Sequence, residues 1–193
     1  MNYFSAHIGG SGRILLQQVT IKSLGVPVFL GVILPREDAA ELRRLSAWFR
    51  NRAVPELQGK GAERVFLLGE ECASQLPEGT CFALCAGENA YLCSAEDQVL
   101  CQILSVFGRT RLTGLTGAGQ GERLSIVLSQ RNQLLLCPQR WTLDRKIRER
   151  IAEGAVPDAE EELEAFLREL AAAGAPEDAG GAAPENAILL VVR

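Results

Sequence analysis

Apolar residues gather along this chain in short runs separated by turn residues, a pattern typical of β-strands. The first third contains three such runs, at residues 3–8, 13–21 and 26–34. Further runs predict strands at residues 62–69, 80–85, 90–94, 98–107, 123–129, 133–137 and 187–192. Because Gly, Glu, Asn or Asp turns separate the runs of the middle third, we expect antiparallel sheets joined by hairpins, with one face of each strand buried.

Three other stretches place apolar residues at helical spacing, and we expect helices at residues 36–52, 142–152 and 157–174. Thr142 is a candidate N-cap for the second helix, and Gly174 ends the third. The predicted buried stripes are Leu42, Leu45 and Phe49; Leu143, Ile147 and Ile151; and Leu163, Phe166, Leu167 and Leu170.

These elements make an α+β domain in which helices cover sheets. The 193 residues contain no repeat and no long linker, and residues 175–186 form a loop of small residues that cannot pack a core. We therefore expect a single domain over residues 1–193.

Composition excludes several classes of protein. With 47% apolar and 23% charged residues, this is a soluble globular chain. The net charge of −4 gives no electrostatic reason to expect nucleic acid or an anionic membrane as a partner. The first residues lack a signal peptide, and the longest apolar run, residues 26–34, is half of what a membrane crossing needs, so a cytoplasmic location is expected.

The six cysteines are expected to be free thiols in a reducing compartment, where they pack as small apolar side chains. A metal site is the alternative, but Cys81, Cys85, Cys93 and Cys101 lack the CxxC spacing of zinc sites. His7, the single histidine, has no Ser or Cys beside it in a catalytic pattern and is expected to be a structural strand residue.

The order of elements and several motifs resemble the metal-dependent protein phosphatases of type 2C (PPM type). "LLLCPQRW", two helices and "ENAILLVVR" follow the order of the family's strand into Ser-Asp-Gly-Leu, its helices and its terminal Asp-Asn-Ala-Thr strand. "FLGVILPRED", "GSGRILLQQ", "GENAYLC" and "LTGLTGAGQ" resemble, more distantly, its Asp-Gly-His-Gly-Gly, Arg-x-x-Asn-Glu-Asp, Gly-Asp-Ser-Arg and Leu-Thr-x-x-Leu-Gly motifs. The resemblance implies a four-layer α-β-β-α sandwich, in which two stacked antiparallel sheets are flanked by helices.

Members of this family use carboxylates to hold two Mg²⁺ or Mn²⁺ ions, and a metal-bound water attacks phosphorus. In the register of the motifs, the family's aspartates correspond here to Gln18, Leu34 and Gln139. Only Glu88 and Glu185 keep a carboxylate, each one methylene longer. At an effective dielectric of 20, losing three carboxylates removes on the order of 20 kcal/mol of gross attraction for the ions, partly offset by desolvation. We therefore expect no catalytic residues, no bound metal and no cofactor.

Two features near the expected site have both a specific and an ordinary interpretation. Arg13 corresponds to the family's phosphate-binding arginine, a role that suits a guanidinium, but it is equally an ordinary turn residue. In "CPQRW", Trp141 would fill the metal position or Arg140 would supply its positive charge, and the alternative is that both merely cap a strand end. Gly9, Gly10 and Gly12 are expected to form a hairpin turn rather than a phosphate loop.

The sequence thus predicts a catalytically inactive phosphatase-like domain that acts as a binding or regulatory module in protein phosphorylation signalling. Its expected partners are a phosphoprotein, a kinase or another regulatory protein, and the preference for arginine over lysine indicates a GC-rich bacterial genome. The alternative is an active Mg²⁺- or Mn²⁺-dependent Ser/Thr phosphatase with an atypical site built from Glu88, Glu185 and Asp97. A purely structural oligomer subunit is a third possibility.

Overall fold

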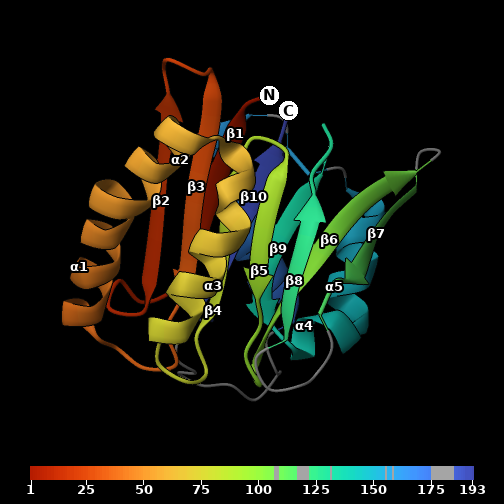
Figure 1. The fold of residues 1–193 in the computed structure, drawn as a ribbon. Coiled ribbons are helices and arrows are strands. Elements are labelled where there is room, and N and C mark those ends of the chain that lie inside the picture. Colours follow the sequence, from red (N-terminus) through yellow and green to blue (C-terminus); the bar gives the residue numbers. More distant parts are fainter. Residues whose placement is uncertain (107–108, 117–121, 131, 155, 158, 175–184) are drawn as a thin grey trace.

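The structure, a computed structural model, describes residues 1–106, 109–116, 122–130, 132–154, 156–157, 159–174 and 185–193. Within these ranges the chain forms two antiparallel sheets of five strands each (Figure 1). The expected loop at residues 175–186 lies outside the described residues except for Glu185 and Asn186, as do Phe107 and residues 117–120 of "LTGLTGAGQ".

Sheet A has the strand order β1-β10-β9-β6-β7 and sheet B the order β2-β3-β4-β5-β8. The strands of sheet A are β1 Tyr3–Ile8, β10 Ala187–Val192, β9 Gln133–Pro138, β6 Gln98–Val106 and β7 Arg109–Gly114. Those of sheet B are β2 Ile14–Ile21, β3 Val26–Ile33, β4 Cys81–Ala86, β5 Asn89–Cys93 and β8 Arg123–Val127. Because β1 and β2 belong to different sheets, the glycine segment between them connects the sheets, and the expected hairpin turn at Gly9–Gly12 is wrong.

Helices cover the outer face of each sheet. Sheet B is covered by α1 Ala39–Trp48, the π-helical turn η1 Phe49–Ala53, α2 Val54–Lys60, the 3₁₀ turn η2 Ala62–Arg64 and α3 Val65–Gln75. Sheet A is covered by α4 Arg140–Leu143, α5 Arg145–Glu153 and α6 Glu160–Ala173. This arrangement confirms the α-β-β-α sandwich (Figure 1).

The alternation of side chains along β3 shows how the layers are joined. Phe29 and Ile33 point into the core between the sheets, whereas Leu30 and Val32 point under the helices of sheet B. All four are fully buried, because a central strand of a sandwich covered by helices is enclosed on both faces.

The strand predicted at residues 62–69 is wrong, because this segment forms η2 and the start of α3. Val65, Leu68, Gly69 and Cys72 are buried at helical spacing, so the apolar run belongs to a helix face. A Cβ atom on Gly69 would lie 2.2 Å from Cγ of Tyr91, so the missing side chain lets α3 pack directly on β5.

The remaining expectations for the core are largely confirmed. The four predicted stripe residues of α6 are buried, as are Leu42, Leu45 and Phe49, although Leu143 is 78% exposed. All six cysteines are free and buried, and burial raises the pKa of the Cys72 thiol to about 12. His7 lies in β1 with an exposed side chain. No helix in the described ranges is both long and apolar enough to cross a membrane.

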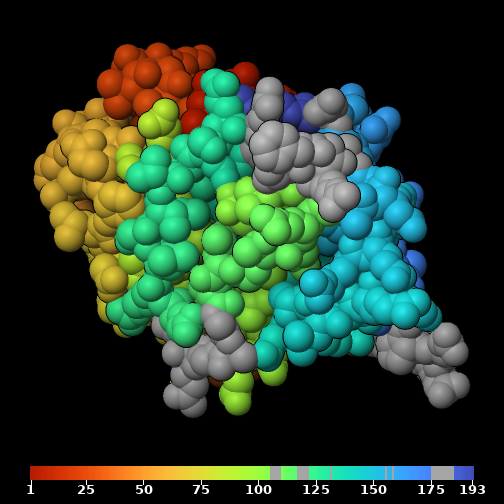
Figure 2. Space-filling model, turned by 90° about the vertical axis from the view of Figure 1, so that its right-hand side faces the viewer, coloured from red at the N-terminus to blue at the C-terminus, as the bar shows by residue number. Residues whose placement is uncertain are grey.

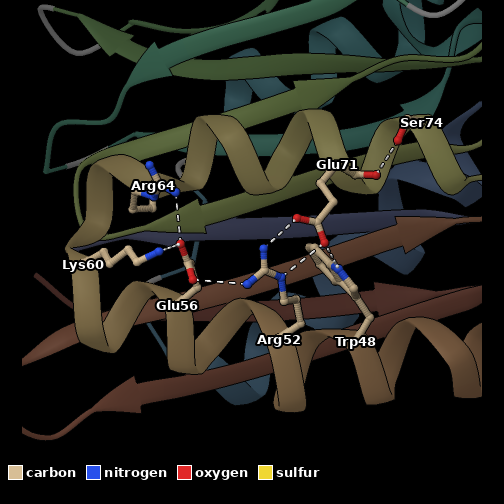
Figure 3. A network of polar contacts seen from close by, with 7 residues as sticks. All are labelled: Trp48, Arg52, Glu56, Lys60, Arg64, Glu71 and Ser74. Carbon is tan, nitrogen blue, oxygen red and sulfur yellow. Dashed lines mark hydrogen bonds and ion pairs between the residues drawn. The ribbon is translucent and has the colours of Figure 1, made fainter.

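Two carboxylates tie the helices over sheet B to one another (Figure 3). Glu71 of α3 accepts hydrogen bonds from Trp48 Nε1 at 3.2 Å and from Arg52 Nη2 at 3.2 Å. On the other side of the Arg52 guanidinium, Nη1 contacts Glu56 of α2 at 3.2 Å. Arg52 lies in the π-helical turn, so one guanidinium joins η1, α2 and α3.

We predict that this network makes the free energy of unfolding depend on pH in the acid range. Hydrogen bonds from Arg52 and Trp48 lower the pKa of Glu71, so the folded state resists protonation and the unfolded state takes up the proton first. The contribution is complete above the ordinary glutamate pKa of about 4.3 and is lost as the pH falls through the lower folded value. In urea denaturation from neutral to acid pH, Glu71→Gln should lose less stability on acidification than the wild type.

The matched control is Glu63→Gln, which changes an exposed glutamate of η2 in the same way. Acid sensitivity that is the same in Glu71→Gln, Glu63→Gln and the wild type would contradict this role of Glu71.

Candidate functional site

One end of the sandwich, opposite the two chain termini, collects most of the residues expected to form the site (Figure 1). We call this end the pole and define it by residues 9–13, 34–38, 139–141 and 185–186. Adjacent strands of an antiparallel sheet begin and end there, and their connecting segments therefore meet. The pole is thus formed by the loop after β1, the segment after β3, the start of α4 and the entry to β10.

A chain of hydrogen bonds holds these segments together. Arg13 donates through Nε to the carbonyl oxygen of Leu34 at 3.0 Å, and the Leu34 amide donates to the carbonyl oxygen of Arg13 at 2.8 Å. The Gly10 amide donates to Oδ1 of the buried Asn186 at 3.2 Å. The Gln139 amide, after β9, donates to the carbonyl oxygen of Asp97, before β6, at 3.0 Å.

The carboxylate of Glu185 is the central charged group of the pole. The Arg140 guanidinium forms an ion pair with one of its oxygens, and the indole N–H of Trp141 donates to the other. The Glu185 side chain is only 12% exposed, whereas that of Arg140 is 51% exposed. The chain itself therefore neutralises the carboxylate, with a cation that stays in contact with water.

Local structure explains why these two side chains reach Glu185. The Thr142 hydroxyl donates to the Gln139 carbonyl oxygen at 2.8 Å, so the chain folds into the single turn of α4 directly after β9. Trp141 is fully buried among the side chains beneath α5 and α6. The expected N-cap Thr142 is wrong, because Asp144 caps α5 by accepting from the Ile147 amide at 3.0 Å.

Gly9 makes the close approach between β1 and the entry to β10 possible. Its φ angle of +127° lies in a region that residues with side chains rarely adopt. A Cβ atom at this position would lie 2.3 Å from Oδ1 of Asn186. Both the backbone conformation and the space therefore require glycine.

Two of the expected site residues lie elsewhere. Gln18 pairs with Phe29 across β2 and β3, five residues along β3 from Leu34, which corresponds to about 17 Å. Its amide accepts from the Ser5 hydroxyl at 3.3 Å and donates to the Tyr3 carbonyl oxygen at 2.8 Å. Glu88 is exposed in the turn between β4 and β5, at the other end of the sandwich.

The residues of the pole do not fit a pair of divalent ions. The Leu34 side chain, which has no donor atom, is 1% exposed and packs under the helices of sheet B. Gln139 offers a neutral amide, and Glu185 is already bound by Arg140 and Trp141. Within the described ranges, no group of three or more His, Cys, Asp or Glu side chains is placed to hold a metal. Hard cations prefer several charged oxygens, and this pole does not assemble them.

Two pole residues, Asp38 and Asn186, were not among the site residues expected from the sequence. Asp38 caps α1 by accepting from the Ala40 and Glu41 amides at 3.1 and 2.9 Å, and its own amide donates to Gly12 at 2.9 Å. The signal for Asp38 was its place before a helical stripe, a common N-cap position. Asn186 carried no such signal, because its partner Gly10 is distant in sequence.

Solved structures that match the chain include phosphatases and phosphatase domains. The chain matches the PP2C phosphatase domain of SpoIIE from Bacillus subtilis with a TM-score of 0.57 and 10% identity, covering 99% of this chain and 62% of that one. It matches the PPM Ser-Thr phosphatase MsPP from Mycobacterium smegmatis with a TM-score of 0.52 and 17% identity, over 100% and 99% of the two chains. PppA from Pseudomonas aeruginosa, described as a key regulatory component of T6SS, matches with a TM-score of 0.51 and 13% identity, over 100% and 99%.

No protein-family model matches the sequence, and no curated protein does. At identities of 10 to 17%, these structural likenesses establish the fold, which is the one that the sequence resemblance predicted.

We predict that Arg140 stabilises the pole by neutralising Glu185. Arg140→Ala leaves a carboxylate that is mostly out of water with only the indole as a donor, and should lower the free energy of unfolding by about 1–3 kcal/mol. Adding Glu185→Gln to this variant should recover part of the loss, because a neutral amide needs no cation. Arg43→Ala, on the exposed side of α1, is the matched control; equal losses in denaturation for the Arg43 and Arg140 variants would count against the ion pair.

We also predict that Gly9→Ala lowers the free energy of unfolding by about 2–4 kcal/mol, since it combines backbone strain with a steric clash. Gly25→Ala separates the two causes, because Gly25 has a φ angle of +63° but no atom within 4 Å of the added Cβ. The Gly25 variant should lose about 1 kcal/mol in the same thermal denaturation. Equal losses would show that the approach of Asn186 to Gly9 does not constrain the pole.

Proposed function

We propose that this chain, which has the fold of the PPM-type protein phosphatases, is a phosphatase-like domain without metal-dependent phosphatase activity. It acts as a binding or regulatory module in protein phosphorylation signalling. The observation that carries the proposal is the bound state of Glu185: its carboxylate, at a position where the resemblance places a metal ligand, is paired with Arg140 and with the indole N–H of Trp141.

Charge explains why this arrangement opposes a metal ion. A unit charge pair at 4 Å is worth about 4 kcal/mol at an effective dielectric of 20, so a guanidinium and a divalent ion at that distance repel each other by about 8 kcal/mol. A metal would have to displace Arg140 first. At the pole positions where the resemblance places metal ligands, it would then find one carboxylate, one neutral amide and the apolar Leu34 side chain. Without a metal-bound water, the family's hydrolytic reaction has no nucleophile.

The same pole keeps a group suited to recognition of phosphate. Arg13 is half-buried, and its Nε–H donates to the Leu34 carbonyl oxygen, which fixes the orientation of the guanidinium. No carboxylate among the described residues forms an ion pair with it. A guanidinium held in this way suits an anionic group on a partner, which supports a phosphoprotein, a kinase or another regulator as the partner class. PppA, described as a regulatory component, is a structural neighbour that supports the same class.

We predict that Mn²⁺ produces no binding heat in calorimetry at millimolar concentration, and that the protein hydrolyses neither p-nitrophenyl phosphate nor a phosphopeptide with Mg²⁺ or Mn²⁺ present. MsPP, assayed in parallel, is the positive control for the reagents. Turnover that disappears in Glu185→Ala would overturn the proposal and establish the alternative, an active phosphatase with an atypical metal site. Turnover unchanged by Glu185→Ala would indicate a contaminating phosphatase.

A further inference from the structure

A hollow lies between β7 and α5, and Leu143 of α4 also lines it. Its volume is about 390 Å³, and none of the residues that line it belongs to the pole. Figure 2 faces this side of the molecule, where the green of β7 lies next to the cyan of α4 and α5. Arginines dominate the charged groups of its lining: Arg111 from β7, and Arg145 and Arg148 from α5.

The hollow reaches β7, an edge strand of sheet A among the described residues. β7 is the last strand in the sheet order and, within the described ranges, pairs with β6 alone. The consecutive residues Thr110, Arg111 and Leu112 all line the hollow, although successive side chains of a strand point to opposite faces. The hollow therefore borders the edge of the strand, where backbone groups can pair with an added strand.

The charge of the hollow is opposite to that of the chain. Three arginines and one glutamate give it a formal charge of +2, whereas the whole chain carries −4. Glu149 pairs with Arg145 at 3.0 Å, and both side chains are exposed. Arg111 and Arg148 are exposed and form no ion pair with any carboxylate of the described ranges. Two guanidinium groups thus face a shared hollow without an ion pair to a carboxylate of the described residues.

Apolar groups complete the lining. Leu143 is 78% exposed, the highest value among the large apolar side chains that the structure describes, and Leu112 is half-buried. An apolar side chain of a ligand could cover both while its anionic group meets the arginines. This combination of edge backbone, positive charge and apolar contact is that of a peptide site rather than a site for a free ion.

We propose that the β7–α5 groove binds an extended peptide segment that carries a phosphorylated serine or threonine. The segment pairs with the edge of β7, and its phosphate accepts hydrogen bonds from Arg111 and Arg148. A phosphate dianion matches the +2 charge of the groove, and guanidinium groups bind phosphate through two parallel N–H groups. A second copy of this chain fits less well, because antiparallel pairing of two β7 edges would bring arginine-rich strands together.

The partner class rests on the proposed function, whereas the location rests on the groove alone. The probe is a short fluorescein-labelled peptide of alternating valine and threonine with a central phosphoserine, followed by fluorescence anisotropy. We expect Arg148→Glu and Arg111→Glu each to weaken its binding at least about tenfold. Arg43→Glu, the same charge change on the exposed face of α1 over the other sheet, should bind like the wild type. Methylation of alternate peptide amides should also weaken binding, because it removes donors to the strand edge.

Several results would overturn the proposal. These are equal affinity of the Arg148, Arg111 and Arg43 variants, equal affinity for peptides with serine or glutamate in place of phosphoserine, and no binding by the wild type up to about 1 mM peptide. A dimer in sedimentation that Arg148→Glu dissociates would assign the groove to self-association instead. Phosphate released from the probe would contradict the proposed function but leave the location of the groove intact, so the two failures are distinguishable.

Discussion

A carboxylate that is nearly excluded from water must have a partner, and at the pole Arg140 and Trp141 meet this requirement for Glu185. Glu185 lies at the entry to β10, and its neighbour β9 ends in the turn that carries Arg140 and Trp141. The carboxylate is thus neutralised by the strand next to it in the sheet, as part of folding. Because Arg140 already neutralises the Glu185 carboxylate, this site attracts a further cation only weakly. If several carboxylates at this end of the same fold were unpaired, they would repel one another unless metal ions bound between them.

The sandwich also explains where polar chemistry can occur at all. Side chains between the sheets, such as Phe29, Leu134 and Ile188, are fully buried, and the helices enclose the outer faces. Within the described strands, charged side chains are consequently confined to strand ends and edge strands, where water remains within reach. The pole is a set of strand ends, and the β7–α5 groove is a sheet edge.

Hydrophobic runs predicted the strands and the layered fold well, because period and burial are local properties of the sequence. The run at Val65–Leu68 was misread since a short apolar run fits a strand or a helix, and only Cys72 and the contact of Gly69 with Tyr91 distinguish them. Motif order brought Gln139 and Glu185 to one pole but misplaced Gln18, because pairing with Phe29, which no motif encodes, fixes its position along β2. The sequence did not predict the β7–α5 groove, because Arg111 and Arg148 come from distant parts of the chain.

The arginines at the pole and in the groove differ in whether they already form an ion pair and in how exposed they are. This difference bears on where an anionic partner would bind. Arg140 faces water but is neutralised by Glu185, so an incoming anion would compete with a carboxylate at full contact. Arg13 is half-buried and oriented by a carbonyl oxygen, and no carboxylate of the described residues forms an ion pair with it. Arg111 and Arg148 are exposed and form no ion pair with a carboxylate of the described residues, and they lie beside the edge strand β7. Because an anion gains most where a cation has no ion pair and the backbone offers further hydrogen bonds, the phosphorylated segment that we propose would be attracted more strongly at the edge of sheet A than at the pole.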